Sequence, residues 1–162
     1  MARSGSAGKT RPTPISTERT RAPLVYQLRV RAAPRVVFDA FFREPQRWLC
    51  RDAQVTPEVG GKLRMCWPDG CFEGRFVQCQ QGLNARFSWR MEGDYLPETM
   101  VVVTMDPGSS PDETAFELEH YGFGVGPDWD AMYVGAARAW ASYLKNLRAV
   151  LETGVDLREA DE

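Results

Sequence analysis

The sequence predicts an α+β fold in which a curved, six-stranded antiparallel sheet wraps around one long C-terminal helix, with two short helices near the start. Two patterns predict this class: six short segments alternate between apolar and polar residues, and one long segment near the C-terminus has apolar residues at helical spacing. Turn signals separate most of the six segments, which favours antiparallel pairing. The chain has 162 residues, of which 43% are hydrophobic, and this length suits one globular domain.

The first strand and the two short helices are predicted close together in the chain. Residues 24–30 alternate between apolar and polar side chains, as expected for a half-buried strand. Pro34 opens a helix over residues 35–42, whose apolar side chains fall at helical spacing. Pro45 starts a second short helix or turn that carries Trp48.

Five further strands are predicted in the middle of the chain. The first begins after Gly60-Gly61 and ends at the turn signal Pro68-Asp69-Gly70. The next covers residues 72–79, and we expect a β-bulge at Gly74. The last three strands are expected around residues 87–91, 99–105 and 116–120.

The last predicted element is a long helix. Gly126-Pro127-Asp128 supplies its start signal and Gly154 its stop signal. Between them apolar residues recur every three or four positions over about 27 residues, which corresponds to roughly 40 Å of helix. A helix of this length can cross a whole sheet and cover its apolar face, which is a helix-grip arrangement.

The chain is predicted to contain one domain with a tail at each end. Residues 1–22 are rich in Ser, Thr, Gly, Pro and Arg, show no apolar periodicity, and are expected to form a disordered basic tail. Residues 23–154 hold every predicted element and form the single domain. Residues 155–162 are short and acidic, and we expect them to be frayed.

Composition and charge argue against several classes of protein. The formal net charge of −2 at pH 7 argues against a nucleic-acid partner, and no apolar run is long enough to cross a membrane. The chain has one histidine and no Cys-x-x-Cys pair, so we predict no metal site and no cofactor.

The four cysteines are expected to be reduced thiols that pack as small apolar side chains. Cys66 and Cys71 flank a predicted hairpin and could come close, depending on the register of the turn. No secretory signal is visible at the start of the sequence, and we therefore expect a cytoplasmic protein. The other two cysteines are Cys50 and Cys79.

The candidate site lies between the inner face of the sheet and the facing side of the long helix. Small residues from position 135 to position 141 surround Trp140 on the helix, opposite large side chains on the sheet. They predict either a closely packed helix or a cavity, and composition favours neither. The predicted ligand-binding residues are Trp48, Met65, Trp67, Phe87, Trp89, Met91, His120, Trp129, Tyr133 and Trp140.

The predicted inner face carries only two titratable side chains, Tyr26 and His120. General acid–base catalysis needs a positioned group of suitable pKa, usually with a second group beside it, so we predict no catalytic residue. His120 is either a structural hydrogen-bonding residue or, if a cavity exists, the residue that orients a polar group of the ligand together with Tyr133.

The predicted outer face of the sheet is basic. It is either a docking surface for an acidic protein partner or a solvated face balanced by Glu73, Glu117 and Glu119. Met100 and Val102 are apolar on the same face and weakly indicate a homodimer. The basic residues are Arg29, Arg31, Lys62, Arg64, Arg75, Arg86 and Arg90.

Several motifs along the predicted domain have the order and spacing of a known family. Residues 57–61 resemble a P-x-x-G-G entry to a strand, and residues 69–89 resemble a D-G … G … L-x-F-x-W pattern. Residues 118–123 read L-E-H-Y-G-F and match L-x-H-x-G-F. Trp140, Leu144 and Leu147 match a closing G-W-x-x-x-L-x-x-L signature, in which Ala139 stands where glycine is usual.

On these motifs the chain resembles the bacterial branch of the family of the C-terminal domain of the activator of heat-shock-protein-90 ATPase. That family belongs to the START-like (SRPBCC), birch-pollen-allergen-like helix-grip superfamily. The resemblance implies a helix-grip fold and, for the superfamily, binding of apolar small molecules between sheet and helix. It implies no established reaction, and the co-chaperone activity of the eukaryotic relatives also uses a separate N-terminal domain, for which this chain has no room.

Three functional hypotheses follow from the residues and the resemblance. The first is binding of a hydrophobic or aromatic small molecule in an internal cavity. The second is a protein-interaction module of co-chaperone type that uses the basic outer face. The third, an enzyme of cyclase or hydrolase type, is the least favoured, because it rests only on superfamily relatives that catalyse reactions with few residues.

Overall fold

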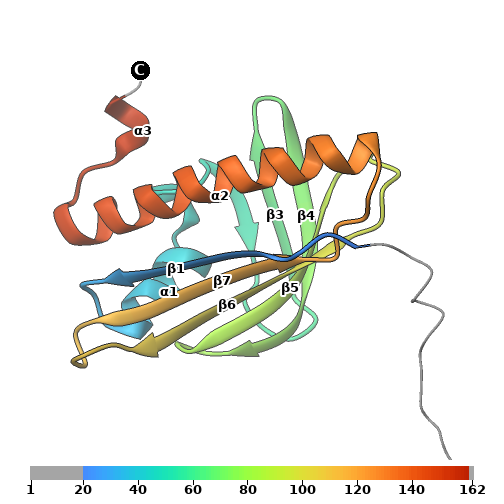
Figure 1. The fold of residues 1–162 in the computed structure, drawn as a ribbon. Helices are drawn as coiled ribbons and strands as arrows, with labels where there is room; N and C mark the ends of the chain where they lie inside the picture. The colour runs from blue at the N-terminus through green and yellow to red at the C-terminus, as the bar shows by residue number, and fades with distance from the viewer. Residues whose placement is uncertain (1–19, 161–162) are drawn as a thin grey trace, which may run out of the picture.

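The computed structural model describes residues 20–160, in which a curved sheet wraps around a long helix (Figure 1). The helical elements are α1 (Pro34–Phe42), the 3-10 helix η3 (Pro45–Arg47), α2 (Pro127–Thr153) and α3 (Leu157–Ala160). The strands are β1 (Leu24–Val30), β2 (Asp52–Val55), β3 (Lys62–Trp67), β4 (Gly70–Gln80), β5 (Asn84–Met91), β6 (Thr99–Pro107) and β7 (Thr114–Tyr121). The architecture is the predicted helix-grip fold.

The strands form one antiparallel sheet in the order β1-β7-β6-β5-β4-β3-β2. The first strand therefore pairs with the last, with Leu24 opposite His120 and Val30 opposite Thr114. The remaining strands follow one another in chain order, and Figure 1 shows α2 crossing the face of the sheet. The pairing of β1 with β7 brings the start of the domain next to His120.

The structure has one strand more than the six predicted. The additional strand, β2, pairs with β3, with Asp52 opposite Cys66 and Val55 opposite Leu63. It is four residues long and lies at the edge of the sheet. An alternation of four residues is too short to distinguish an edge strand from a loop in the sequence.

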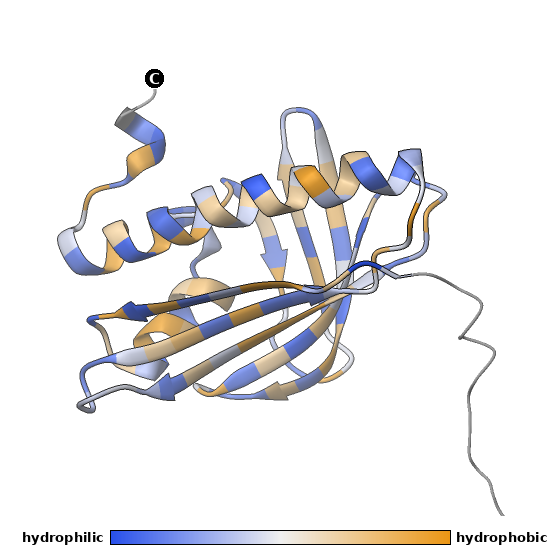
Figure 2. Ribbon diagram, viewed as in Figure 1, coloured by the Kyte–Doolittle hydropathy of each residue, from blue (hydrophilic) through white to orange (hydrophobic). Residues whose placement is uncertain are grey.

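Aromatic residues of α1 fill the space between the sheet and the C-terminal half of α2. Phe38, Phe41 and Phe42 are completely buried. The ring of Phe41 stacks on Phe116 of β7 and on Trp140 of α2, at centroid distances of 6.1 and 6.5 Å. Figure 2 shows that the strands alternate between hydrophobic and hydrophilic residues, as expected when one face of the sheet covers this core.

Both ends of α2 agree with the sequence signals. Pro127 occupies the first turn, and Asp128 and Asp130 lie there too, where the helix dipole favours negative charge. Gly154 follows the last residue with a φ of 77°, a left-handed conformation that ends the helix.

The predicted bulge at Gly74 is wrong in position. The register between β4 and β5 shifts between Phe76 and Gln78, which leaves Val77 as the extra residue. Gly74 instead permits a close approach of the two strands, because a Cβ atom there would lie 1.7 Å from the backbone oxygen of Ser88.

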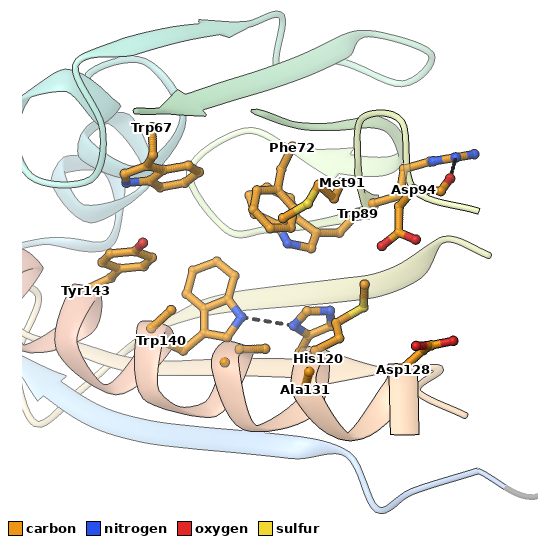
Figure 3. A pocket seen from close by; sticks show the side chains of 15 residues that line it. Trp67, Phe72, Trp89, Met91, Asp94, His120, Asp128, Ala131, Trp140 and Tyr143 are labelled. Carbon is orange, nitrogen blue, oxygen red and sulfur yellow. Dashed lines mark hydrogen bonds between the residues drawn. The ribbon is translucent and has the colours of Figure 1, made fainter. Parts of the chain in front are cut away.

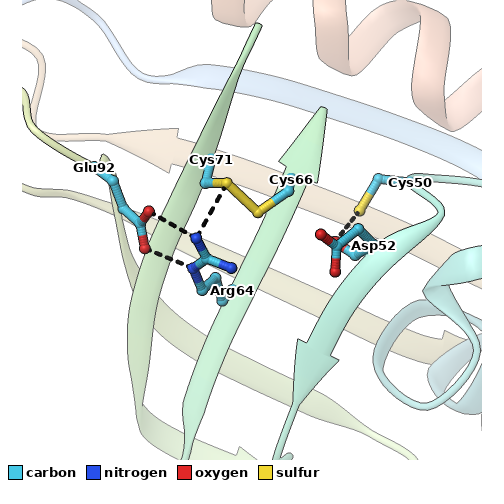
Figure 4. Close-up of a disulfide and its surroundings, with 6 residues drawn as sticks. All are labelled: Cys50, Asp52, Arg64, Cys66, Cys71 and Glu92. Atoms are coloured by element: carbon cyan, nitrogen blue, oxygen red, sulfur yellow. Dashed lines mark hydrogen bonds and ion pairs between the residues drawn. A yellow bond between two sulfur atoms is a disulfide. The ribbon is translucent and has the colours of Figure 1, made fainter. Parts of the chain in front are cut away.

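Cys66 and Cys71 form a disulfide, so the prediction of four reduced thiols is wrong for this pair (Figure 4). The register of β3 and β4 places them directly opposite each other, with their Cα atoms 4.0 Å apart. Nη2 of Arg64 donates to Sγ of Cys71 at 3.4 Å. The other two cysteines are free thiols. The cytoplasmic location, which rests partly on reduced thiols, stays a prediction.

The start of the described chain is attached to the domain. Residues 1–19 of the predicted basic tail lie outside the described residues. Arg21 donates its backbone N–H to the carbonyl of Phe123 at 3.0 Å and its Nε to the carbonyl of Gly124 at 2.9 Å, and its guanidinium pairs with Asp130. These contacts hold the chain beside the first turn of α2.

The described part of the predicted frayed end, residues 155–160, is also held in place. The amide of Leu157 in α3 donates to Oδ1 of Asn146 at 2.7 Å, and Asn146 is buried in α2. Nη2 of Arg158 binds the carboxylate of Asp156 at 2.8 Å, and this pair holds the pKa of Asp156 well below its usual range. The sequence signal for fraying misses these contacts because they depend on tertiary packing.

None of the helices formed by residues 20–160 is both long enough and apolar enough to cross a membrane.

Candidate functional site

A cavity of about 350 Å³ lies between the N-terminal half of α2 and the inner face of the sheet (Figure 3). Gly135, Ala136 and Ala139 line it on the helix side, and their small size leaves room that larger side chains would fill. A Cβ atom added at Gly135 would have no neighbour within 4 Å. Of the two arrangements that the sequence leaves open, the structure therefore has the cavity.

Five aromatic rings form much of the cavity wall. Phe72 of β4 stacks on Trp89 of β5, with ring centroids 4.9 Å apart and planes 12° from parallel. Trp67 of β3 stacks on Tyr143 of α2 at 5.6 Å and 11°. The centroid of Trp140 lies 5.9 Å from that of Trp89 and 6.1 Å from that of Tyr143. Three strands and one helix thus surround one space with aromatic surface.

His120 of β7 lines the cavity with both ring nitrogens engaged. Nε1 of Trp140 donates to Nδ1 of His120 at 3.0 Å, so Nδ1 carries no proton. The proton of a neutral imidazole is then on Nε2, which donates to Oγ1 of Thr99 at 2.7 Å. Oγ1 of Thr99 donates in turn to the carbonyl of Trp89 at 2.9 Å. Each of the three donor protons, on Trp140, His120 and Thr99, therefore has an acceptor.

Burial keeps His120 neutral. The side chain is 1% exposed, and desolvation lowers its pKa to about 3. A neutral imidazole with both nitrogens hydrogen-bonded cannot act as a general acid or base without breaking one of these bonds. Both ring nitrogens are bonded to protein groups, as the structural alternative expects, while a role of His120 in orienting a ligand stays a prediction.

Three charged residues line one end of the cavity, and the two carboxylates among them come from the loop after β5 and from α2, not from the inner face of the sheet. They are Arg90, Asp94 and the exposed Asp128, and Figure 3 shows both carboxylates at this end. Nη2 of Arg90 donates to the carbonyl of Asp94 at 2.5 Å. Arg90 lines this end of the cavity and also lines a groove on the outer face, where the sequence placed it. The amide of Leu96 donates to Oδ1 of Asp94 at 3.1 Å.

The structure brings together half of the predicted ligand-binding residues. The five that line the cavity come from β3, β5, β7 and α2, and in the sequence they are up to 73 positions apart, from 67 to 140. These residues are Trp67, Trp89, Met91, His120 and Trp140.

Three of the other five predicted residues belong to the packed core and do not line the cavity. Trp48 is completely buried, and its Nε1 donates to the carbonyl of Ala40 at 2.7 Å. Met65 and Phe87 are each 1% exposed and pack in the same core. Their inward orientation is as predicted, but they contact other core side chains.

The remaining two, Trp129 and Tyr133, also lie outside the cavity lining. Both rings pack edge-on against Phe123, at centroid distances of 6.3 and 5.1 Å. The hydroxyl of Tyr133 donates to the carbonyl of Ala22 at 3.0 Å. Tyr133 follows the lining residue Met132, and one helical step of about 100° turns it toward the start of the chain.

Two aromatic lining residues, Phe72 and Tyr143, are absent from the predicted site. Tyr143 is three positions after Trp140, so helical spacing from that tryptophan was a usable signal. Phe72 of β4 is predicted to face inward, and its stacking on Trp89 places it in the cavity wall.

Ion pairs offset part of the basic outer face. Nε and Nη2 of Arg64 bind the two carboxylate oxygens of Glu92 at 2.7 and 3.0 Å, and this pairing lowers the pKa of Glu92. Nη1 of Arg29 lies 3.3 Å from Oε1 of Glu113. The face is therefore less positive than its arginines alone suggest.

Among residues 20–160 there is no group of three or more His, Cys, Asp or Glu side chains arranged to hold a metal ion.

Comparison with known proteins gives a family match and many structural matches. The family model described as Activator of Hsp90 ATPase homolog 1-like protein matches residues 31–152. A comparison with curated proteins gives no match.

Several solved structures share the fold at low sequence identity. The Aha1 dimer from Colwellia psychrerythraea has a TM-score of 0.70 and 16% identity, over 83% of this chain and 98% of that chain. Protein MLL2253 from Mesorhizobium loti has a TM-score of 0.69 and 18% identity, over 81% and 97%. PFC0360w, an HSP90 activator from Plasmodium falciparum, has a TM-score of 0.67 and 19% identity, over 80% and 95%.

Proposed function

This chain belongs to the family described as Activator of Hsp90 ATPase homolog 1-like protein, and from this premise we propose that it binds an apolar or aromatic small molecule between α2 and the sheet. The observation that carries the proposal is the cavity of about 350 Å³ under α2. Ligand pockets in proteins typically measure about 300–1,000 Å³ and have mainly apolar walls with a few polar groups. The cavity is within this range and is lined mainly by rings and small side chains.

The small residues that α2 contributes to the cavity wall also support the proposal that the cavity binds a ligand. A glycine in a helix interior lowers the stability of the helix by about 1 kcal/mol relative to alanine. Helix stability therefore does not explain a glycine at position 135, where it lines the cavity. A Cβ atom added at this exposed position would have no neighbour within 4 Å. Its absence leaves space beside Ala136 and Ala139, where a ligand would contact the helix directly.

The two hydrogen bonds of the His120 ring support the proposal that the ligand is apolar. Both ring nitrogens are occupied by Trp140 and Thr99, so recognition does not rely on a hydrogen bond from the imidazole. Flat aromatic surfaces such as Phe72 and Trp89 favour ligands that stack or pack edge-on. The ligand would be selected by its shape and apolar surface.

Isothermal titration calorimetry with naphthalene tests the proposal. Naphthalene has no hydrogen-bonding group, so its binding reports the apolar cavity alone. The variant Gly135→Leu fills the cavity from the helix, and Val134→Leu adds the same residue at an exposed neighbour that does not line it. We expect the wild type and Val134→Leu to bind alike and Gly135→Leu to bind at least about tenfold more weakly, a loss of about 1.4 kcal/mol. Absence of binding to the wild type, or equal binding by all three proteins, would overturn the proposal.

A protein partner is the second candidate function. A dimeric Aha1 and an HSP90 activator are among the proteins that share this fold. The pairing of Arg64 with Glu92 gives the acidic-partner hypothesis less support than the sequence suggests. Such a partner, or a second copy of the chain, would bind in a salt-dependent way if the outer face is used.

A further inference from the structure

The Cys66–Cys71 disulfide lies on the outer face of the sheet. Met65 of β3 is buried in the core, and side chains alternate along a strand, so Cys66 points to the opposite face. Helix α2 lies on the inner face (Figure 1). Both cysteines of the disulfide are partly exposed. A partly exposed disulfide can react with a thiol from solution, which a disulfide in the core cannot do while the protein stays folded.

Arg64 and Asp52 flank the disulfide with opposite charges (Figure 4). Nη2 of Arg64 donates to Sγ of Cys71 at 3.4 Å. Glu92 holds the same guanidinium in place through bonds of 2.7 and 3.0 Å. Asp52 is directly opposite Cys66 in the pairing of β2 with β3. A thiolate on Cys71 would therefore lie against a cation, whereas a thiolate on Cys66 would lie nearer a carboxylate.

This difference predicts which sulfur atom is attacked. In thiol–disulfide exchange the more stable thiolate is the faster leaving group. Arg64 stabilises negative charge on Sγ of Cys71 through its hydrogen bond, so Cys71 is the better leaving group and Cys66 is the sulfur that is attacked.

The two free thiols of the chain are poor nucleophiles. Cys50 is buried, and burial raises the pKa of its thiol to about 11. Burial also raises the pKa of the Cys79 thiol. Both thiols are therefore mainly neutral at physiological pH, and the thiolate is the nucleophilic form. The attacking thiolate must come from solution.

We propose that the Cys66–Cys71 disulfide is a site of exchange with small-molecule thiols, at which Cys66 takes up the incoming thiol. A thiolate from solution uses its electron pair to form a bond to Sγ of Cys66. The Cys66–Cys71 bond breaks, and its electron pair goes to Sγ of Cys71 beside Arg64. The exchange opens the cross-link between β3 and β4, the strands that carry Trp67 and Phe72 of the cavity wall. This inference goes beyond the proposed function and does not depend on it.

Brief treatment of the folded wild type with 2-mercaptoethanol, stopped by excess iodoacetamide, tests the inference. Iodoacetamide alkylates the released thiolate and so prevents the disulfide from closing again. Trypsin cleavage after Arg64 and Arg75 gives one peptide, residues 65–75, that contains both cysteines, and its fragmentation in a mass spectrometer assigns each modification. We expect mercaptoethanol on Cys66 and the alkyl group on Cys71, at least about tenfold more often than the reverse.

Two variants assign this preference to Arg64. Arg64→Gln removes the cation beside Cys71 and should bring the two products to similar amounts. Arg75→Gln removes a cation that is exposed on β4, opposite Lys62 and away from the disulfide, and should keep the preference. The product ratio of the wild type needs no variant, so it stands even if Arg64→Gln loosens the sheet.

Three results would overturn the inference. The first is a disulfide that reacts in urea but not in the folded wild type, because the site would then be inaccessible. The second is equal modification of Cys66 and Cys71, or a preference for Cys71, in the wild type. The third is a product ratio that Arg64→Gln leaves unchanged, because the hydrogen bond from Arg64 would then not select the leaving sulfur.

Discussion

The indole N–H of Trp140 donates to Nδ1 of His120, and this bond joins α2 to β7 inside the cavity wall. The chain of donors continues from His120 to Thr99 on β6 and from there to the carbonyl of Trp89 on β5. A helix and three neighbouring strands are thus connected by groups that are almost completely buried. His120, the single histidine of the chain, thus links the helix wall of the cavity to its sheet wall.

The neutral state of His120 predicts a pH-dependent stability. Above pH 6.5 the histidine is neutral in the folded and unfolded chains, and below it the unfolded chain takes up a proton that the folded chain, with a pKa of about 3, does not. The free energy of unfolding should therefore fall by up to about 1.4 kcal/mol per pH unit as the pH drops below 6.5.

Urea unfolding of the wild type and of His120→Gln between pH 6.5 and pH 4.5 measures this dependence. The lower limit of pH 4.5 keeps the titration of Glu92 and Glu113 out of the measurement. Folding lowers the pKa of both carboxyl groups, so they change the free energy of unfolding only below their ordinary pKa of 4.5. The variant should be less stable at neutral pH and show a shallower slope. Parallel slopes for the two proteins would rule out a neutral buried His120.

Gly135→Ala should stabilise the protein by up to about 1 kcal/mol, because alanine favours a helix more than glycine and the added Cβ meets no other atom. The reverse change at an exposed position of the same helix, Ala141→Gly, should destabilise by a similar amount. Urea unfolding measures both. A loss of stability in Gly135→Ala would mean that the space beside this residue is occupied.

Gly74→Ala should destabilise the protein by more than about 3 kcal/mol or prevent folding. Its Cβ would lie 1.7 Å from the backbone oxygen of Ser88, so β4 and β5 would have to separate. Gly93→Ala is the control, since Gly93 has a φ of 83° but no atom within 4 Å of an added Cβ. That variant should lose only the cost of the strained backbone, roughly 1–2 kcal/mol. Equal losses in the two variants would contradict the close approach of the strands.

Replacing Cys66 and Cys71 together by serine should lower the free energy of unfolding by about 2 kcal/mol, because the disulfide closes a short loop with a sequence separation of 5. The loosened hairpin carries Trp67 and Phe72, so naphthalene should also bind more weakly. Cys79→Ser, at a free thiol, is the control. If dithiothreitol leaves the stability of the wild type unchanged, the disulfide does not stabilise the protein.

Much of the fold could be predicted because its signals are local. The alternation of residues 24–30 identifies β1, and the start and stop signals at Pro127 and Gly154 give the bounds of α2. Edge strand β2 could not be predicted, since four residues carry too little periodicity. The disulfide was missed for another reason: whether Cys66 faces Cys71 depends on the register of the turn.

The candidate site was predicted only in part because depth in the core is a tertiary property. Periodicity places Trp48 and Trp89 inside the domain equally well, yet only Trp89 lines the cavity. Tyr133 and Tyr143 belong to the same helix but point in different directions around its axis. Tyr133 binds the start of the chain, and Tyr143 lines the cavity. The carboxylates of Asp94 and Asp128 come from a loop and a helix end, whose meeting no local pattern predicts.

The central claim is that an apolar molecule enters the cavity under α2, and methyl NMR of methionine-labelled protein tests it most directly. Met91 and Met132 line the cavity, Met105 is completely buried in the core, and Met100 lies in a groove of the outer face. On addition of naphthalene, the methyl signals of Met91 and Met132 should shift while those of Met105 and Met100 stay in place. Unmoved Met91 and Met132 signals, or a shift confined to Met100, would contradict the claim.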